Sequence, residues 1–213
     1  MGYPILKRTI DLVLAFTLGF LFLPFCLVAA IAIKLESPVG PIFADIPPRV
    51  GKNGKKFFTY KFRSMIPNSY AMMRTNPEFA KLFEEYKRSG YKLREDPRVT
   101  KVGKFIRKYS IDEIPQFINV IRGEMSVVGP RPYYADELRE QEEKYPRTAE
   151  SIKATLTVCP GITGQWQVSG RSDINFEKRI ELDAHYARNL SLWYDLKILA
   201  KTPFAMLSGR GAV

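Results

Sequence analysis

The sequence predicts an α+β fold, a small and mostly helical domain with a short β segment and an N-terminal membrane helix. Three observations support this prediction. An apolar run covers residues 12–33, several later stretches carry apolar residues at helical spacing, and residues 57–65 alternate roughly as a strand does. We expect residues 1–36 to form the membrane segment and residues 37–213 to form a cytoplasm-facing domain with amphipathic helices at the membrane interface.

The apolar run has basic residues on both sides, Lys7 and Arg8 before it and Lys34 after it. It is longer than the roughly 7–15 residues of a signal-peptide core. A spanning helix needs about 20 residues, which the run supplies, but it would place Lys7 and Arg8 outside the cell. A helix that enters one leaflet, turns near Pro24 and returns satisfies both basic flanks. On the residues alone, the kinked spanning helix and the re-entrant helix both stay open.

A short β segment with turns is expected over residues 39–65, where Pro47-Pro48 and Gly51-Lys-Asn-Gly54 are turn signals. On a strand, Lys61 and Arg63 point to the same face, so both can bind one anion. A solvated strand face is the alternative interpretation.

The most informative stretch is residues 96–132, whose centre is the carboxylate pair Asp112-Glu113. Ser110 and Glu113 fit a capping box for a helix that ends near Gly123. Isoleucines at helical spacing predict the buried face of this helix, with both acids off that face in the first turn; they are Ile111, Ile114, Ile118 and Ile121.

A glutamate at this helix position usually only caps, which is the alternative to a functional role for the pair. The surrounding charge favours function. Seven cations flank the two acids, and they are Arg98, Lys101, Lys104, Arg107, Lys108, Arg122 and Arg131. That number exceeds what ion pairing needs, and it indicates a site that also binds a polyanion such as a pyrophosphate.

Two loops carry further candidate phosphate ligands. Pro130-Arg131-Pro132 fixes the backbone around one arginine, which suits bidentate phosphate binding, and a structural turn is the alternative. Arg171 closes a second loop and is another candidate. Residues 67–95, 134–145 and 190–207 are expected to be helical. We interpret the first as packing and the second as solvated. The third suits either the membrane face or the core.

Composition narrows the function classes. The net charge of +11 points to nucleic acid, acidic lipid or a phosphorylated substrate. The two cysteines, Cys26 and Cys159, make no disulfide framework, and we interpret the single histidine, His185, as structural. The sequence contains no Asp-x-Asp, Walker A or Gly-x-Gly-x-x-Gly motif and no Cys/His cluster, which argues against classical metal-dependent glycosyltransferases, nucleotide hydrolases, dehydrogenases and zinc enzymes.

Nearly the whole chain resembles the monotopic phosphoglycosyl transferases, also called bacterial sugar transferases. The motifs that carry this resemblance are DPRVT (96–100), SIDE (110–113), NVIRGEMSVVGPRP (119–132), PGITG (160–164), QWQVSGR (165–171) and LDAHYARN (182–189). The resemblance implies a re-entrant membrane helix with Pro24 at its turn. It implies Asp112 as nucleophile, Glu113 as its partner, and Mg²⁺ with Asp112 as a ligand. Leu23 and Cys159 depart from the family pattern, which often has Ser and usually Arg or Lys there.

By this resemblance, the chain transfers a sugar 1-phosphate from a UDP-sugar to undecaprenyl phosphate through an aspartyl-phosphosugar intermediate and releases UMP. The expected location is the cytoplasmic face of the bacterial inner membrane, in exopolysaccharide, capsule or O-antigen synthesis. Residues 67–95 and the ending 209–212 resemble members that transfer galactose or glucose 1-phosphate. The expected substrate-binding and phosphate-binding residues are Lys61, Arg63, Arg98, Arg107, Arg131 and Arg171.

The expected partners are the UDP-sugar, undecaprenyl phosphate and membrane lipid, without nucleic acid, and a homodimer is left open. The rival hypothesis is a membrane-tethered basic domain that binds acidic lipid or nucleic acid without catalysis. Such a domain would show salt-sensitive binding and no UMP release.

Overall fold

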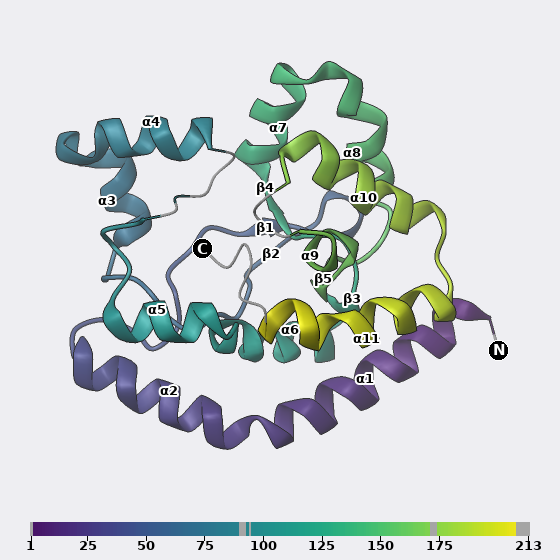
Figure 1. Cartoon of the computed structure of the whole chain (residues 1–213), viewed down its shortest axis with the longest axis horizontal. Coiled ribbons are helices and arrows are strands. Elements are labelled where there is room, and N and C mark those ends of the chain that lie inside the picture. Colours follow the sequence, from purple (N-terminus) through teal and green to yellow (C-terminus); the bar gives the residue numbers. More distant parts are fainter. Residues whose placement is uncertain (1, 90–92, 94, 171–173, 208–213) are drawn as a thin grey trace.

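The computed structural model describes the chain except for residues 1, 90–92, 94, 171–173 and 208–213. The described part is mostly helical with two small sheets, which confirms the predicted α+β fold. The stretch 209–212, cited above for the choice of sugar, lies outside the described residues. A bent pair of helices forms a curved layer along one side of the molecule, and the other elements lie on its concave side (Figure 1).

The curved layer consists of α1 (Tyr3–Leu21) and α2 (Leu23–Glu36), which meet at Phe22 with a bend of 57°. Pro24 stands in the first turn of α2, where its missing N–H costs no intrahelical bond. No single helix in the described ranges is long and apolar enough to cross a membrane, whereas the bent pair together has the required length and composition. Side chains such as Phe20, 81% exposed, leave a large apolar surface uncovered.

The inner side of this helix pair packs on the domain. Ala15 of α1 joins a core with Val127, Tyr186 and Ile198, and Ile33 of α2 joins a smaller cluster. The pair is therefore part of the folded structure on one side and exposed apolar surface on the other.

The predicted strand over residues 57–65 is correct only at its start. β2 (Lys56–Phe57) pairs antiparallel with β1 (Arg49–Val50), which also pairs with β4 (Tyr133–Tyr134). A turn with Gly54 at a φ of 77° joins β1 to β2, as the turn signals predict. Beyond Phe57 the chain stays extended but makes only isolated bridges, because loops lie beside it there.

A second, parallel pair joins β3 (Ser126–Val128) to β5 (Gly161–Thr163). Gly129, directly after β3, packs so closely on the loop before β5 that a Cβ would lie 2.5 Å from the Cys159 carbonyl oxygen. The pairing therefore places the Pro130-Arg131-Pro132 loop beside the start of the next element, α9 (Gln165–Val168).

Residues 67–95 are helical where described, as predicted. They form α3 (Ser69–Thr75), a 3₁₀ turn η2 (Pro77–Phe79) and α4 (Ala80–Arg88). The Arg74 guanidinium lies 3.9 Å from the Tyr70 ring centroid, and its Nη2 lies 2.6 Å from Asp136 Oδ2. This ion pair holds the helical arm against the rest of the domain.

The central segment is helical where predicted, but the face that is buried differs from the predicted one. A 3₁₀ helix, η3 (Ile111–Gln116), continues into α6 (Phe117–Ile121), after α5 (Lys101–Lys108). Ser110 has a φ of 56° and makes no side-chain cap hydrogen bond, so the predicted capping box is wrong. Asp112 is buried, whereas Ile118 and Ile121 are exposed beside α1, so the predicted burial pattern is also wrong. A lysine compensates the buried acid, and the isoleucines extend the exposed apolar surface.

The second half of the chain is helical. Its elements are α7 (Ala135–Lys144), η4 (Pro146–Thr148), α8 (Ala149–Thr155), α10 (Phe176–Arg188) and α11 (Leu192–Leu207). α7 is not fully solvated as predicted, because Glu137 is 0% exposed and lies 3.1 Å from Arg179 Nη2. His185 Nδ1 lies 3.2 Å from the Tyr194 hydroxyl, a structural contact as expected. α11 buries Ile198 in the core and exposes the side chains of Trp193 and Phe204, and contact of these two with a membrane stays a prediction.

We predict that Pro24→Ala straightens the break between α1 and α2 toward one spanning helix, because alanine restores a backbone N–H and removes the ring. The measurement is cysteine labelling at positions 2 and 52 in a chain whose Cys26 and Cys159 are replaced by serine. The parent should be labelled at both positions from one side of the membrane, and Pro24→Ala should move position 2 to the other side.

Pro4→Ala is the matched control, because Pro4 stands in the first turn of α1 and not at the bend. It should leave the labelling pattern unchanged. Labelling of the parent from opposite sides would refute re-entry.

Candidate active site

A cleft of about 540 Å³ brings most of the predicted site residues together. Its wall is formed by the extended segment around residues 59–70, by η3, and by the loop after β3. The predicted residues that line it are Lys61, Arg63, Arg98, Arg107, Asp112, Glu113 and Arg131. Arg171, the remaining predicted phosphate ligand, lies outside the described residues.

Lys61 connects the two acids of the pair. Its Nζ lies 3.0 Å from Asp112 Oδ2 and 3.1 Å from Glu113 Oε1. The backbone keeps this geometry, because the Phe62 amide donates to the Asp112 carbonyl at 2.9 Å. The side chain of Asn119, 0% exposed, adds a second connection: its Oδ1 accepts from the Tyr60 amide and its Nδ2 donates to the Phe58 carbonyl. The extended segment is thus attached to both η3 and α6.

Burial and charge oppose each other at the pair. Burial raises the pKa of Asp112, whose relative exposure is 2%; Lys61 offsets part of this effect, and the neighbouring Glu113 adds to it. Burial alone would lower the pKa of Lys61, but the two carboxylates outweigh it and leave this pKa raised. Lys61 therefore stays charged, and Asp112 depends on that charge to ionise.

Arg131 presents its guanidinium to the cleft. The group lies 5.2 Å from the Trp166 ring centroid, and its buried Nε has no hydrogen-bond partner. A buried guanidinium nitrogen without a partner is suited to an anionic ligand. Arg107 lines the same cleft, and its charge helps to lower the pKa of Asp112.

Arg63 and Arg98 differ from Arg131, because their guanidinium groups are bonded within the protein. Arg63 donates to the carbonyls of Ser37 and Val39, in the loop after α2. Arg98 binds both carboxylate oxygens of Asp96 and the Ser69 carbonyl. Both arginines shape the cleft wall, and a direct phosphate contact by either stays a prediction.

Two acids bind arginine residues of the cleft wall, and the sequence prediction does not include either of them. Asp96 holds Arg98, and its local Asp-Pro-Arg spacing is a signal that could have revealed it. Asp183 of α10 accepts the backbone N–H of Arg131 at 3.1 Å and the Tyr133 hydroxyl at 2.8 Å. Nothing local reveals this second role, since 52 positions separate Asp183 from Arg131.

The described residues contain no group of three or more His, Cys, Asp or Glu side chains close enough to hold a metal ion. The Mg²⁺ site with Asp112 as a ligand therefore stays a prediction. Oδ2 of Asp112 is buried and has no hydrogen bond, although it lies within ion-pair distance of Lys61. Mg²⁺ takes one or two carboxylates and fills its remaining positions with water and substrate phosphate oxygens. The pair fits such an ion together with a phosphorylated substrate.

Comparison with known proteins decides the family. The profile described as "Bacterial sugar transferase" matches residues 2–209. The chain belongs to the bacterial sugar transferase family. The resemblance in the motifs around Asp112 is thereby confirmed over nearly the whole chain.

This sugar transferase is 44% identical over 211 residues to the UDP-galactose-lipid carrier transferase of Erwinia amylovora, covering 97% of the chain and 41% of that protein. It is 40% identical over 205 residues to the UDP-glucose:undecaprenyl-phosphate glucose-1-phosphate transferase of Escherichia coli, covering 94% and 40%. It is 41% identical over 210 residues to the exopolysaccharide production protein ExoY of Rhizobium meliloti, covering 97% and 87%. The chain thus spans about two fifths of the first two relatives and most of ExoY.

The two departures from the family pattern lie away from the cleft of this sugar transferase. Leu23 is 48% exposed at the start of α2. Cys159 is half-buried, with its Sγ 3.9 Å from the Gly123 carbonyl beyond the end of α6. Neither residue is among those that line the cleft.

We predict that Asp183 makes the stability of the protein depend on pH. Burial raises the pKa of Asp183 to about 7, although bonds from Tyr133 and Arg131 lower it in part. In the unfolded chain this pKa is about 3.9. Between these values the native state retains a proton that the unfolded chain has lost, so the free energy of unfolding falls as the pH rises from about 4 to about 7.

Asp183→Asn removes this titration. Its free energy of unfolding, measured with urea in detergent, should rise relative to the parent by about 2 kcal/mol between roughly pH 5 and pH 8. Glu143→Gln, an exposed acid of α7, is the control and should show no such gain. If the free energy of unfolding of Asp183→Asn and that of the parent vary with pH in parallel, the prediction is contradicted.

Proposed function

We propose that the chain is a membrane-bound phosphoglycosyl transferase that moves a sugar 1-phosphate from a UDP-sugar to undecaprenyl phosphate. The observation that supports this most is the position of Lys61 between Asp112 and Glu113, in a cleft that Arg107 and Arg131 also line. A carboxylate that attacks a pyrophosphate meets like charge, which nearby cations must offset. The names of the Erwinia amylovora and Escherichia coli relatives include the same two substrate classes.

In the first half-reaction, Asp112 is the nucleophile. One of its carboxylate oxygens forms a bond to the sugar-bearing phosphorus. The bond from this phosphorus to the bridging oxygen breaks, and UMP leaves with that oxygen and the electron pair. Lys61 keeps Asp112 ionised before attack, and Arg131 holds the phosphate with its unpaired Nε.

In the second half-reaction, an oxygen of the lipid phosphate attacks the same phosphorus. The bond to Asp112 breaks, the carboxylate is restored, and the product is undecaprenyl diphosphate carrying the sugar. Glu113 is more exposed than Asp112, with 31% of its side chain accessible, so it faces the incoming acceptor. It orients the acceptor phosphate, takes a proton from it or shares the metal ion. A bound Mg²⁺ would shield phosphate charge in both halves.

The lipid acceptor accounts for the exposed apolar surface of α1 and α2. We place this helix pair in the cytoplasmic leaflet of the bacterial inner membrane, with both basic flanks on the cytoplasmic side. The reaction would then be the first membrane step of exopolysaccharide, capsule or O-antigen synthesis. The sugar is galactose or glucose in this proposal, because relatives at 40–44% identity are named for one or the other.

The first prediction for this function is a covalent intermediate. The purified chain should be incubated with UDP-galactose, UDP-glucose and N-acetylated UDP-sugars without acceptor. With its preferred UDP-hexose it should release one equivalent of UMP and gain the mass of one hexose phosphate on Asp112. Undecaprenyl phosphate should remove the adduct, Asp112→Asn should abolish it, and Glu113→Gln should slow turnover severely.

Glu143→Gln is the control, because it removes an exposed acid of α7 outside the pair. It should leave adduct formation intact. UMP release that requires both substrates together would show direct attack by the lipid phosphate. Salt-sensitive binding of acidic lipid or nucleic acid, without any UMP, would favour the rival binding domain.

The second prediction concerns pH. Lys61→Met leaves the buried Asp112 without its nearest cation, so the pKa of Asp112 rises further. Because the nucleophile must be ionised, the acid limb of the UMP-release profile should move to higher pH, and kcat near pH 7 should fall about 10- to 100-fold. Lys55→Met, in the exposed turn between β1 and β2, should leave the profile unchanged. If the acid limb of the UMP-release profile lies at the same pH in Lys61→Met and in the parent, the role assigned to Lys61 is contradicted.

A further inference from the structure

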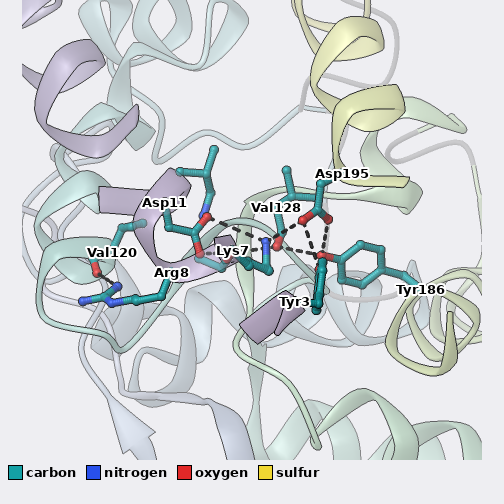
Figure 2. Close-up of polar contacts among 10 residues, drawn as sticks. Tyr3, Lys7, Arg8, Asp11, Val120, Val128, Tyr186 and Asp195 are labelled. Carbon is teal, nitrogen blue, oxygen red and sulfur yellow. Dashed lines mark hydrogen bonds and ion pairs between the residues drawn. The ribbon is translucent and has the colours of Figure 1, made fainter. Parts of the chain in front are cut away.

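The first turns of α1 carry polar side chains that contact three other segments of the domain (Figure 2). Arg8 contacts the first segment. Its Nη1 donates to the Val120 carbonyl at 2.6 Å, and its Nη2 donates to the Ile121 carbonyl at 3.0 Å. Both carbonyls lie in the last turn of α6, where intrahelical bonds end and a cation interacts favourably with the helix dipole. The fork of the guanidinium thus attaches α1 to the end of α6.

Asp11, three residues further along α1, contacts the second segment. Its Oδ2 accepts from the Ser126 hydroxyl at 2.7 Å, and its Oδ1 accepts from the Val127 amide at 3.0 Å. Asp11 is only 5% exposed, so its charge depends on these donors and on Lys7, 3.7 Å away. The carboxylate therefore attaches α1 to β3.

A third contact fixes the rotation of α1 about its own axis. Asp195 of α11 lies 3.1 Å from Lys7 Nζ and accepts from the Tyr3 hydroxyl at 3.0 Å (Figure 2). At its other end, α1 stays close to the start of α6, since a Cβ on Gly19 would lie 3.9 Å from the Phe117 Cβ. With its rotation and its course set in this way, α1 presents Arg8 and Asp11 in fixed directions.

The two segments that α1 holds are those that carry the reacting groups. α6 continues η3, which carries Asp112, and β3 leads within three residues to Arg131. We propose that Arg8 and Asp11 are positioning residues that set the separation between the nucleophile and the arginine that holds its target phosphate. This inference rests on the proposed roles of Asp112 and Arg131. It makes the membrane helix part of the catalytic frame and not only an anchor.

Arg8 has a second possible contribution, from charge alone, because any cation before the apolar run favours a cytoplasmic N-terminus. Arg8→Lys separates the two contributions. Lysine keeps the charge, but its single nitrogen cannot replace a planar fork that donates to two carbonyls. Thr9→Ala is the matched control, because the Thr9 hydroxyl bonds only to the Ile5 carbonyl within α1.

The kinetic experiment compares Arg8→Lys, Asp11→Asn and Thr9→Ala in the full chain in nanodiscs, with UMP release as the readout. Arg8→Lys should lower kcat about 10- to 100-fold with little change in KM for the UDP-sugar, because it loosens the nucleophile segment. Asp11→Asn should mainly raise that KM, because it loosens the strand before Arg131. A general loss of structure would instead change kcat and KM in the same way in both variants.

Two measurements test the inference without catalysis. Hydrogen exchange of the peptide covering residues 111–121 should be faster in Arg8→Lys. The sequence has two tryptophans, so Trp193→Phe leaves Trp166, next to Arg131, as the only tryptophan, whose emission can be excited selectively over that of the tyrosines. In that background, UDP should change the Trp166 emission of the parent, and Asp11→Asn should weaken UDP binding as measured by this signal.

Wild-type kcat, KM and hydrogen exchange in Arg8→Lys would overturn the inference and leave Arg8 with a charge role alone. If Arg8→Lys and Asp11→Asn show the same changes in kcat and in KM, together with lower thermal stability, both residues have a general structural role and the inference is overturned. Absence of UMP release from the parent would refute the proposed function instead. The exchange and fluorescence results would still decide whether α1 positions the two segments.

Discussion

Lys61 lies between Asp112 and Glu113, and Asp112 is almost fully buried. A carboxylate buried in this way takes up a proton unless a cation lies next to it. The ionisation of Asp112 therefore depends on how the extended segment that carries Lys61 is placed against η3. The Phe62 amide and the Asn119 side chain maintain that placement, and α1 and α2 support it from the other side.

The arginines around the pair divide into two groups by their partners. Arg98 is neutralised by its ion pair with Asp96, whereas Arg63 donates its guanidinium hydrogens to backbone carbonyls, so neither group is directed at the acid pair. Arg131 and Arg107 line the cleft and act on the pair more directly, Arg107 through the pKa of Asp112. The basic composition thus contributes to the cohesion of the cleft wall, and in the proposed function it also attracts the anionic substrate.

The sequence predicts those features that depend on local signals. The apolar run, the helices within 67–95, the break near Pro24 and the grouping of acids with cations all follow from spacing and composition. The orientation of the central helix does not, because periodicity identifies an apolar face without saying whether it meets the core or a membrane. The sequence pattern therefore wrongly predicts that Ile118 is buried and Asp112 exposed; the structure shows the opposite. Arg131 and Asp183 meet only through the tertiary fold.

The contacts of α1 also bear on how the chain is made. Tyr3 and Asp195 bond across 192 positions, and Asp11 bonds to Ser126 across 115. During synthesis from the N-terminus, α1 leaves the ribosome long before these partners exist. At the proposed membrane location, lipid would cover the apolar side of α1 at once, whereas the polar side gains its last partner only after α11 has been translated. The bilayer would then support α1 in an unfinished chain, and completion of the chain would add the packing on the domain while the apolar side stays in lipid.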